Sequence, residues 1–333
     1  MNDGFSILRG TDILELMAGR EPDIVEIVRE AYLTHDSGRS VNPDSYFLRF
    51  PDKPDARIIA LPAYLGGAAD VAGIKWISSF PGNVARGVQR ASAVLVLNDY
   101  ATGYPFALLE AAAISAARTA ATAALAARTL VPHQPAGLGV IGGGVIARTV
   151  CDYLAAEGLL PGTVVCHDLH APSAAALAAH LADRHGVDAT VGGRDSALGH
   201  DLVLLATTAP APYIPATRIF GPQQVILNIS LRDLAPEILL RTNNVLDDVE
   251  HCLKAATSPH LAEQLSGGRG FVTGTLAGVL TGEAELDRAK PTVFSPFGLG
   301  VLDLAVGHRL FQWARREGRL LEVPDFFGET RRW

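Results

Sequence analysis

The chain has 333 residues, of which 48% are hydrophobic and 19% are charged, and its formal net charge is −7. This length suits about two domains of roughly 100–200 residues each, and the composition is typical of a folded α/β protein rather than a disordered one. The acidic balance and the lack of a long basic run exclude the electrostatic footprint of a nucleic-acid binder. We therefore expect a small molecule as the partner.

We expect neither a targeting segment nor a membrane span. The N-terminal stretch MNDGFSILRG carries an acidic residue where a signal peptide needs a basic region, and no apolar core follows it. The most apolar long stretch, 111–130, is mostly alanine and holds two arginines, whereas a membrane span needs about 20 strongly apolar residues. We expect a cytoplasmic protein without a membrane partner.

The cysteines give no sign of a metal or disulfide site. Cys151, Cys166 and Cys252 are odd in number and scattered, without the paired spacings of a zinc site or a disulfide framework. Buried thiols are the interpretation we favour over a catalytic role.

Short helices and strands make up the first part of the chain. Helical spacing of apolar residues predicts amphipathic helices, and alternating or continuous apolar runs predict strands joined by turns. The expected helices cover 12–16 and 23–33, a turn covers 51–55, and the expected strands cover 57–65, 72–80 and 92–110, the last folded at a hairpin over 101–103. This pattern indicates an antiparallel β unit followed by an alanine-rich helix from about Ala111.

The composition changes at VPHQPAG (131–137), where two prolines end the helix because the ring removes a backbone donor. Strands and helices then alternate, and the strands are continuous apolar runs, which favours a doubly wound parallel sheet. We predict a Rossmann domain over 131–300. The other domain, for substrate binding and dimerisation, is an α+β unit over 1–130, to which 301–333 returns through a helix over 301–317.

A glycine-rich motif is the strongest local signal. In LGVIGGGVIA (138–147), Gly142, Gly144 and Ala147 fit G-x-G-x-x-G/A after a strand and at a helix start, where backbone N–H groups can hold a pyrophosphate. A glycine-rich turn without a nucleotide is the alternative. For a dinucleotide, we expect contacts from Gly142, Gly144, Val145 and Ile146.

The next strand ends in Asp168, slightly beyond the roughly 20 residues expected for the acid that binds a ribose hydroxyl. A carboxylate repels a 2′-phosphate and no arginine follows closely, so NAD is favoured over NADP. His167 and His170 flank Asp168, but without further acidic ligands nearby they indicate solvated strand-end residues. We expect no metal site.

One arginine interrupts the small-residue helix ISAARTAATAALAA (114–127). Arg118 is always charged and costly to bury unpaired, so a helix that holds it is expected to aim it at an anion. A structural salt bridge to a residue such as Glu110 is the alternative.

Together with the glycine-rich turn, IKWISSFPGN (74–83), ATGYPFALLE (101–110) and ISAARTAATAALAA resemble the ornithine cyclodeaminase/μ-crystallin family over nearly the whole chain. Three further stretches look most like the N-(2-amino-2-carboxyethyl)-L-glutamate dehydrogenases of 2,3-diaminopropionate biosynthesis: LRFPDKPDARIIALPAYL (48–65), NISLRDLAPEIL (228–239) and TVFSPFGLGVLDLAVGHRL (292–310). The resemblance implies an amino-acid substrate, NAD as cofactor and a homodimer.

The resemblance also implies roles for individual residues. Arg118 would hold the substrate α-carboxylate, which suits a guanidinium because it can grip a carboxylate with two hydrogen bonds. Lys75 would face the substrate, with Asn83 near it, although a lysine that merely extends from a strand edge is the alternative. The remaining cofactor contacts expected are Arg118, Thr119, Thr207 and Ser230.

Catalysis needs a base of tuned pKa, because hydride leaves a C–N carbon only when the amine is neutral. Lys75 can supply it by pairing with a carboxylate or by desolvation in the apolar stretch GIKWI. A substrate with three carboxylates needs more cations than Arg118 and Lys75, so we expect Arg90, and less strongly Arg49, to bind the others.

Two positions depart from the cyclodeaminases. Ile59 stands where they carry a glutamate, and the segment around Asp233 differs locally from that of their catalytic aspartate. Asp233 is nevertheless the expected catalytic carboxylate, with helix N-capping before Pro236 as the alternative. We predict an NAD-dependent oxidoreductase that splits N-(2-amino-2-carboxyethyl)-L-glutamate into 2-oxoglutarate and 2,3-diaminopropionate. An ornithine cyclodeaminase and a μ-crystallin-like ketimine reductase or nucleotide-dependent binding protein are the alternatives.

Overall fold

The computed structural model describes residues 4–328 and divides the chain into two compact units. The first unit comprises Met1–Arg118 and Leu299–Trp333, and the second comprises Thr119–Gly298. The division falls inside helix α3 (Ala112–Leu130), earlier in the chain than the expected boundary at 130. Residues 1–3 and 329–333, the two ends of the expected first domain, lie outside the described residues.

The first unit is built on a mostly antiparallel sheet with the strand order β16-β1-β7-β6-β5-β4-β2, and β3 also pairs with β4. The β1 and β7 pair is parallel, which the expectation of an antiparallel unit did not include. The strands are β1 (Phe5–Leu8), β2 (Ser40–Val41), β3 (Tyr46–Phe50), β4 (Lys53–Leu65), β5 (Val71–Ser79), β6 (Ala91–Asp99), β7 (Pro105–Glu110) and β16 (Leu321–Val323). The helices of this unit are α1 (Gly10–Met17), α2 (Glu21–Asp36), α11 (Gly300–Arg316) and the short 3₁₀ helix η1 (Pro81–Arg86).

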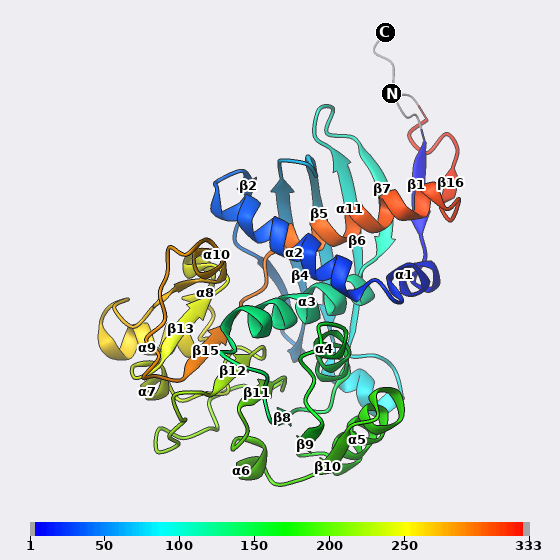
Figure 1. Ribbon diagram of the computed structural model, residues 1–333. Coiled ribbons are helices and arrows are strands. Elements are labelled where there is room, and N and C mark those ends of the chain that lie inside the picture. Colours follow the sequence, from blue (N-terminus) through cyan, green and yellow to red (C-terminus); the bar gives the residue numbers. More distant parts are fainter. Residues whose placement is uncertain (1–3, 329–333) are drawn as a thin grey trace. The chain divides into compact units, whose positions relative to one another are not determined.

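Helix α11 covers one face of this sheet. It packs on β4, β5 and β6, and Figure 1 shows it in orange along these strands. Successive strand residues point to opposite faces, so alternate positions turn toward α11. Leu65, Val71, Leu95 and Leu97 are buried on this face. The apolar alternation that predicted the strands is therefore the pattern of a sheet with one covered face.

The expected helices and the hairpin are confirmed, the turn over 51–55 needs correction, and some strands, such as β1, β3 and β10, were not predicted. The chain folds back between β6 and β7 at 101–103, as predicted. The turn expected over 51–55 is shorter, because β4 already begins at Lys53. Strand β3 was not predicted, since nearly all of its residues are exposed and no apolar alternation marks it.

The second unit contains a fully parallel sheet with the order β10-β9-β8-β11-β12-β15-β13-β14. This confirms the predicted α/β, doubly wound Rossmann class. Its strands are β8 (Leu138–Ile141), β9 (Thr163–His167), β10 (Asp188–Val191), β11 (Leu202–Leu205), β12 (Val225–Asn228), β13 (Asn243–Leu246), β14 (Gly274–Thr275) and β15 (Thr292–Ser295). Its helices, besides α3, are α4 (Val145–Ala156), α5 (Ala171–His185), α6 (Arg194–Ala197), α7 (Pro236–Leu239), α8 (Val249–Cys252), α9 (Ser258–Ser266) and α10 (Leu276–Thr281).

The central strands of this sheet are continuous apolar runs because both of their faces are covered. Every residue of β8, β11, β12 and β15 is buried. The strand order reverses between β8 and β11, and ligands of such sheets bind outside the carboxyl ends of the strands at this reversal. The topology therefore points to the loops after β8 and β11.

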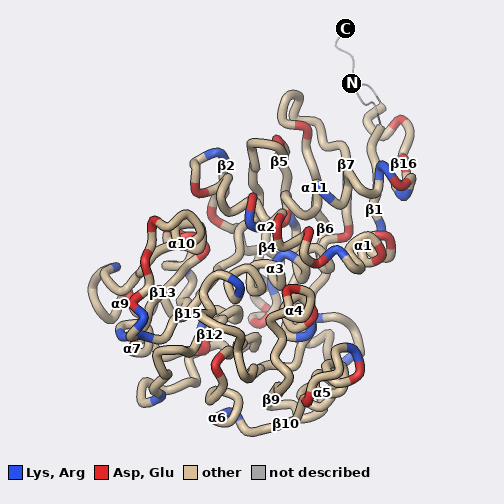
Figure 2. The backbone as a smooth tube through the Cα atoms, viewed as in Figure 1, with Lys and Arg blue, Asp and Glu red and all other residues tan. Residues whose placement is uncertain are grey.

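Three whole-chain expectations can be compared with the structure. The cysteines are free and buried, as predicted. Within residues 4–328, no helix has both the length and the apolar character needed to cross a membrane. Figure 2 shows basic and acidic residues interspersed along the described backbone, in keeping with the absence of a basic run in the sequence.

Candidate active site

A buried cluster of charged side chains lies in the first unit. Lys75, in the middle of β5, donates to Asp303 Oδ2 at 2.6 Å and to the Ser115 hydroxyl at 3.2 Å. Arg118 Nε donates to the other oxygen of Asp303 at 3.3 Å. Ser115 and Arg118 lie one helical turn apart on α3, and Asp303 lies in the first turn of α11. The fold thus brings together the two cations that were expected to face a substrate.

Burial and charge shape the chemistry of this cluster. The side chains of Lys75 and Asp303 are 2% and 1% exposed, whereas that of Arg118 is 12% exposed. Burial lowers the pKa of Lys75 to about 8, and Arg118 acts in the same direction while Asp303 opposes it. With Lys75 protonated, two cations face one carboxylate, so the cluster has a surplus positive charge that suits one more anion.

The alternatives for Lys75 and Arg118 can now be compared with the structure. Lys75 does not extend from a strand edge into solvent, because it is buried and paired. Glu110 is not the partner of Arg118, since its carboxylate accepts from the backbone N–H groups of Ala112 and Ala113 at the start of α3. Arg118 does form an ion pair, but with Asp303.

The other substrate residues expected in the first unit lie near the far end of β5. Arg90 is partly buried just before β6, burial lowers its pKa, and its Nη1 donates to the Ser79 hydroxyl at 2.7 Å. Asn83 lies in η1 and donates to the Gln89 carbonyl oxygen at 3.1 Å. Asn83 is therefore tied into its own loop.

Arg49 is exposed on β3, and its guanidinium lies over the Phe47 ring. The register pairs Arg49 with Arg57 and Arg57 with Ser79 across β3, β4 and β5. Residues directly opposite each other share a face, as do residues two or four apart on one strand. Arg49, Arg57 and Ser79 thus share the face of Lys75.

Ile59 lies on the same face of the sheet. It pairs with Ile77, which is two residues from both Lys75 and Ser79 on β5. An apolar side chain thus lies on the face that holds the cations, at the position where the sequence resemblance leads us to expect a glutamate in the cyclodeaminases.

The glycine-rich turn of the second unit joins β8 to α4. Gly142 has φ of 99°, and a Cβ there would meet the Ala206 carbonyl oxygen, so the turn requires glycine. Gly144 is the N-cap of α4, which has no side-chain cap, and a Cβ on it would meet nothing within 4 Å. The start of α4 thus offers backbone donors next to open space, which fits a pyrophosphate.

The residues that follow in α4 differ in exposure. Val145, the first residue of α4, is exposed, Ile146 is partly buried, and Ala147 is fully buried under the turn.

Asp168 lies directly after β9, at the same edge of the sheet. Its Oδ2 accepts from the Gly143 N–H at 2.7 Å, and its Oδ1 accepts from the His170 N–H at 2.7 Å. The carboxylate therefore holds the glycine-rich turn as well as standing where a ribose-binding acid is expected. His167 contacts the Gly192 carbonyl and His170 contacts the Ser173 hydroxyl, so the two histidines do not converge.

Asp233 is fully buried in the second unit. Its two oxygens accept from the hydroxyls of Thr207, after β11, and Ser230, after β12, each at 2.5 Å. The capping alternative is wrong, since Ala235 is the N-cap of α7 and no side chain caps it. In this arrangement Asp233 positions two expected cofactor residues, and a direct catalytic role stays a prediction. Thr119 begins the second unit on α3 and is partly exposed.

Asp303 and Ser115 are the cluster residues that sequence reasoning missed. A single aspartate inside the apolar run GVLDLAVG was an available signal, because a buried carboxylate almost always has a charged or hydrogen-bonding partner.

The parallel sheet with its glycine-rich turn, and a separate unit with a buried lysine–aspartate–arginine cluster, define a Rossmann-type protein with a charged site. The model of the ornithine cyclodeaminase/mu-crystallin family matches residues 11–317, and the chain belongs to this family. The chain is 26% identical over 328 residues to the N-((2S)-2-amino-2-carboxyethyl)-L-glutamate dehydrogenase of Staphylococcus aureus, covering 95% of this chain and 97% of the relative.

Two solved structures are similar over nearly their full length. The crystal structure of CmnK has a TM-score of 0.88 and 28% identity, covering 98% of this chain and 100% of that one. An archaeal alanine dehydrogenase dimer with bound NAD has a TM-score of 0.86 and 25% identity, covering 97% and 100%. The predicted family is therefore confirmed, and the predicted class and cofactor, an oxidoreductase with NAD, are confirmed at the level of the family.

Proposed function

We propose that the chain oxidises N-(2-amino-2-carboxyethyl)-L-glutamate with NAD and releases 2-oxoglutarate and 2,3-diaminopropionate. The observation that carries this proposal is the set of cations on one face of the first unit's sheet. Lys75 and Arg118 give that face a surplus positive charge near the middle of β5, and Arg49, Arg57 and Arg90 lie near the Ser79 end of the strand. A substrate with three carboxylates matches such a distribution of cations better than a monocarboxylate does.

The second unit suits the dinucleotide. The uncapped start of α4 and the open space at Gly144 would hold the pyrophosphate, and Asp168 would accept hydrogen bonds from the adenosine ribose. When bound, NAD accepts the hydride from the carbon that bears the secondary amine. A 2′-phosphate next to the Asp168 carboxylate would be repelled, which favours NAD over NADP.

The charged cluster would manage the substrate carboxylate and the protons. Arg118 uses Nε for Asp303, so its two Nη groups are not part of that contact and would grip the α-carboxylate. Lys75, with a pKa near 8, can take the amine proton when neutral and can return a proton when charged. Loss of hydride and proton leaves an imine; water adds to its carbon, and the C–N bond breaks to release the ketone and the primary amine.

Ile59 favours this reaction over cyclisation. The cyclodeaminases that the sequence resembles carry a glutamate at this position, and an isoleucine can neither accept a proton nor pair with the second amine of ornithine. Because Ile59 is uncharged, no carboxylate at this position competes with the substrate for Arg49, Arg57 and Arg90.

The decisive experiment incubates the purified chain with NAD and the tricarboxylate, with ornithine or with alanine, and identifies the products by mass. We expect net NADH formation together with 2-oxoglutarate and diaminopropionate from the tricarboxylate only. Conversion of ornithine to proline without net NADH would support a cyclodeaminase instead. Nucleotide binding without turnover of any of these amines would support the reductase or binding-protein alternative.

Replacement of Arg90 tests the match between charges. Arg90→Thr should raise the KM for the tricarboxylate about tenfold or more, because a lost charge-assisted contact is worth roughly 1.5–3 kcal/mol and about 1.4 kcal/mol is one decade. The matched control is Arg86→Thr, since Arg86 is exposed in the neighbouring η1 helix. If both variants keep the normal KM while NAD affinity is unchanged, Arg90 does not contact the substrate.

We also propose that the chain forms a homodimer through the uncovered face of the first unit's sheet. Tyr46, Ala60, Trp76 and Val94 are direct neighbours across β3, β4, β5 and β6, so they form one apolar row on the face opposite Lys75. Tyr46, Trp76 and Val94 are exposed within the chain. A row of exposed apolar residues marks an interaction surface.

Light scattering tests the dimer. Trp76→Glu should shift the chain to monomers at micromolar concentration, because a charge in a closely packed apolar interface is costly. Leu265→Glu changes an apolar residue of the second unit that is even more exposed than Trp76, and it should leave the dimer intact. A monomeric parent chain would refute the proposal outright.

A further inference from the structure

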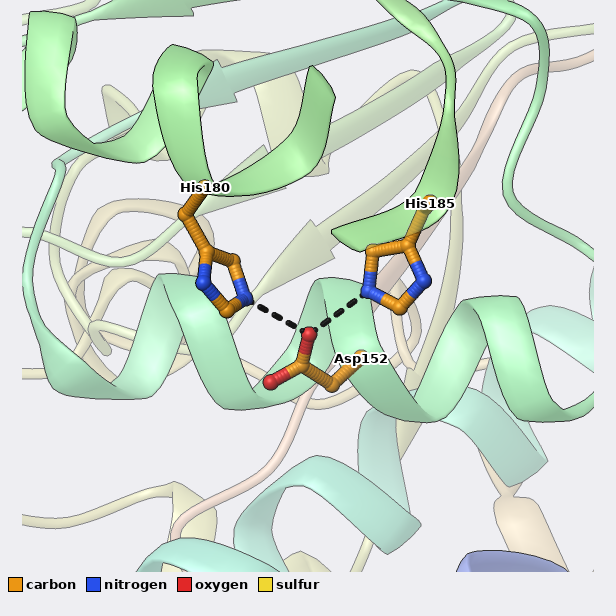
Figure 3. A group of neighbouring side chains, drawn as sticks. All are labelled: Asp152, His180 and His185. Atoms are coloured by element: carbon orange, nitrogen blue, oxygen red, sulfur yellow. Dashed lines mark hydrogen bonds and ion pairs between the residues drawn. The ribbon is translucent and has the colours of Figure 1, made fainter. Parts of the chain in front are cut away.

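Two histidines converge on one carboxylate in the second unit. Asp152 lies on α4, and His180 and His185 lie on α5. The Nε2 atoms of His180 and His185 lie 2.8 and 2.7 Å from the same oxygen, Oδ1 of Asp152. Figure 3 shows both rings directed at this oxygen from the neighbouring helix. Among residues 4–328, this is the group of histidine, cysteine and acidic side chains with the spacing of metal ligands.

The geometry is close to that of a metal site. The three ligand atoms all lie within 4.8 Å of one another. Zinc binds imidazole nitrogen and carboxylate oxygen at about 2.0–2.2 Å, which places neighbouring ligand atoms roughly 3.0–3.4 Å apart in octahedral or tetrahedral sites. The two nitrogen–oxygen distances are shorter than this by about half an ångström, so a small opening of the side chains would admit an ion between them.

We propose that Asp152, His180 and His185 bind one divalent transition-metal ion, with Zn²⁺ the ion of first choice. Two imidazoles and one carboxylate form a ligand set that suits zinc, nickel, copper or cobalt. Calcium and magnesium prefer several oxygen ligands, and this site supplies one carboxylate. Water would complete the coordination, because all three side chains are only partly buried.

Arg184 is the cation that competes with the ion. Its Nε lies 3.6 Å from Asp152 Oδ1, but its side chain is 58% exposed, so it can turn into solvent when an ion enters. The bound ion would join α4, which begins at the glycine-rich turn, to α5, which follows Asp168. We therefore assign the ion a structural role, as a clip between two helices of the dinucleotide unit.

The sequence does not reveal this site because its ligands are dispersed. Asp152 precedes His180 by 28 residues, and the histidines are five residues apart, which does not place them on one face of a regular helix. His185 reaches the same carboxylate because it is the last residue of α5, next to the left-handed Gly186. The expectation that the chain has no metal site is the one that this proposal revises.

The test measures metal bound at equilibrium. The metal-free chain is dialysed against micromolar Zn²⁺, and we expect one Zn²⁺ per chain. His180→Gln with His185→Gln should abolish this binding, and Asp152→Asn should weaken it at least about tenfold. His133→Gln changes an exposed histidine elsewhere in the unit and should bind as the parent does. Absence of bound Zn²⁺ from the parent chain, or equal binding by the double variant, overturns the proposal.

Two further measurements separate an ion site from a hydrogen-bonded contact or a thiol site. Zn²⁺ should raise the Tm of the parent and of His133→Gln but not that of the double variant. If the side chains form hydrogen bonds only, Zn²⁺ leaves the parent Tm unchanged, and the proposal fails. Cys151, next to Asp152, is the nearest thiol in the sequence, so Cys151→Ser should keep the bound ion, and Co²⁺ should give no thiolate charge-transfer band. Loss of binding in Cys151→Ser would assign the ion to the thiol instead.

Discussion

Two deeply buried aspartates, Asp303 in the first unit and Asp233 in the second, are satisfied in opposite ways. Asp303 of the first unit accepts from two cations, Lys75 and Arg118. Asp233 of the second unit accepts from neutral groups, the hydroxyls of Thr207 and Ser230. The first carboxylate compensates charge, whereas the second orients neutral groups.

This difference indicates which role the buried carboxylate has in each unit. Buried ion pairs contribute little net stability, because desolvation offsets the attraction between the charges. A chain that keeps a lysine, an arginine and an aspartate together in a buried cluster therefore gains something other than stability, which in our proposal is a tuned lysine and a carboxylate grip. The hydroxyl-bound Asp233 instead fixes the loops after β11 and β12, next to the edge where a dinucleotide would bind.

The largest effect is expected from neutralising each aspartate in turn. Asp303→Asn should lower the free energy of unfolding by about 3–5 kcal/mol, because it leaves two buried cations without their counter-charge. Asp233→Asn should cost about 1–3 kcal/mol, the penalty of disturbed hydrogen bonds between neutral groups. Urea unfolding of the two variants measures both values.

Similar losses in the two variants would contradict the contrast between the carboxylates. Asp201→Asn is a suitable control, because that carboxylate is at the surface and accepts from one backbone N–H group, that of Ala136. Its effect should be smaller than either of the others.

The second prediction concerns the pH dependence of stability that Lys75 confers. The folded chain holds its pKa at about 8, below the ordinary value of 10.5. Between these two pH values the unfolded chain binds more protons than the folded one, so stability increases as pH rises. The buried charge costs stability in full below pH 8. This cost disappears by pH 10.5 and is worth roughly 3 kcal/mol, since one pH unit corresponds to about 1.4 kcal/mol.

Lys75→Met isolates this contribution from other groups that titrate at high pH. Burial raises the pKa of Cys151 and Cys166, and these thiols oppose the trend in both proteins. The difference in unfolding free energy between parent and variant should therefore rise from pH 8 to 10.5. A flat difference would mean that Lys75 titrates near its ordinary pKa and is no tuned base.

The sequence was sufficient for the parts of the fold that local patterns control. The fully buried strands β8, β11 and β12 are continuous apolar runs, and the hairpin between β6 and β7 has its turn residues in place. Strand β3 was missed because an exposed strand has no apolar pattern to detect. Local signals thus predict elements that bury apolar residues in a regular pattern, and they miss an exposed strand such as β3.

The candidate site was predictable in part, where a local sequence pattern marks a residue. Arg118 and Lys75 stand out because each is a charge in an otherwise apolar or small-residue segment. Their common partner Asp303 is 228 residues from Lys75, and nothing local connects the two. Asp233 was given a capping alternative from its neighbour Pro236, yet its real partners come from two separate loops.

The last prediction extends the comparison to a third kind of carboxylate, Asp168, which is partly exposed and bound to backbone N–H groups. Asp168→Ala should weaken NAD binding by about 1–3 kcal/mol, because the ribose hydroxyls lose their acceptor. NADP should be affected less, since the same change removes a charge that repels its 2′-phosphate. The variant also frees the Gly143 and His170 N–H groups, which would weaken both nucleotides alike. The ratio of the two affinities, measured by calorimetry, is therefore the informative quantity.

Asp201→Ala removes a carboxylate at the opposite, amino end of β11 and should leave that ratio unchanged. A parent chain that binds NAD and NADP equally would show that Asp168 serves the turn alone.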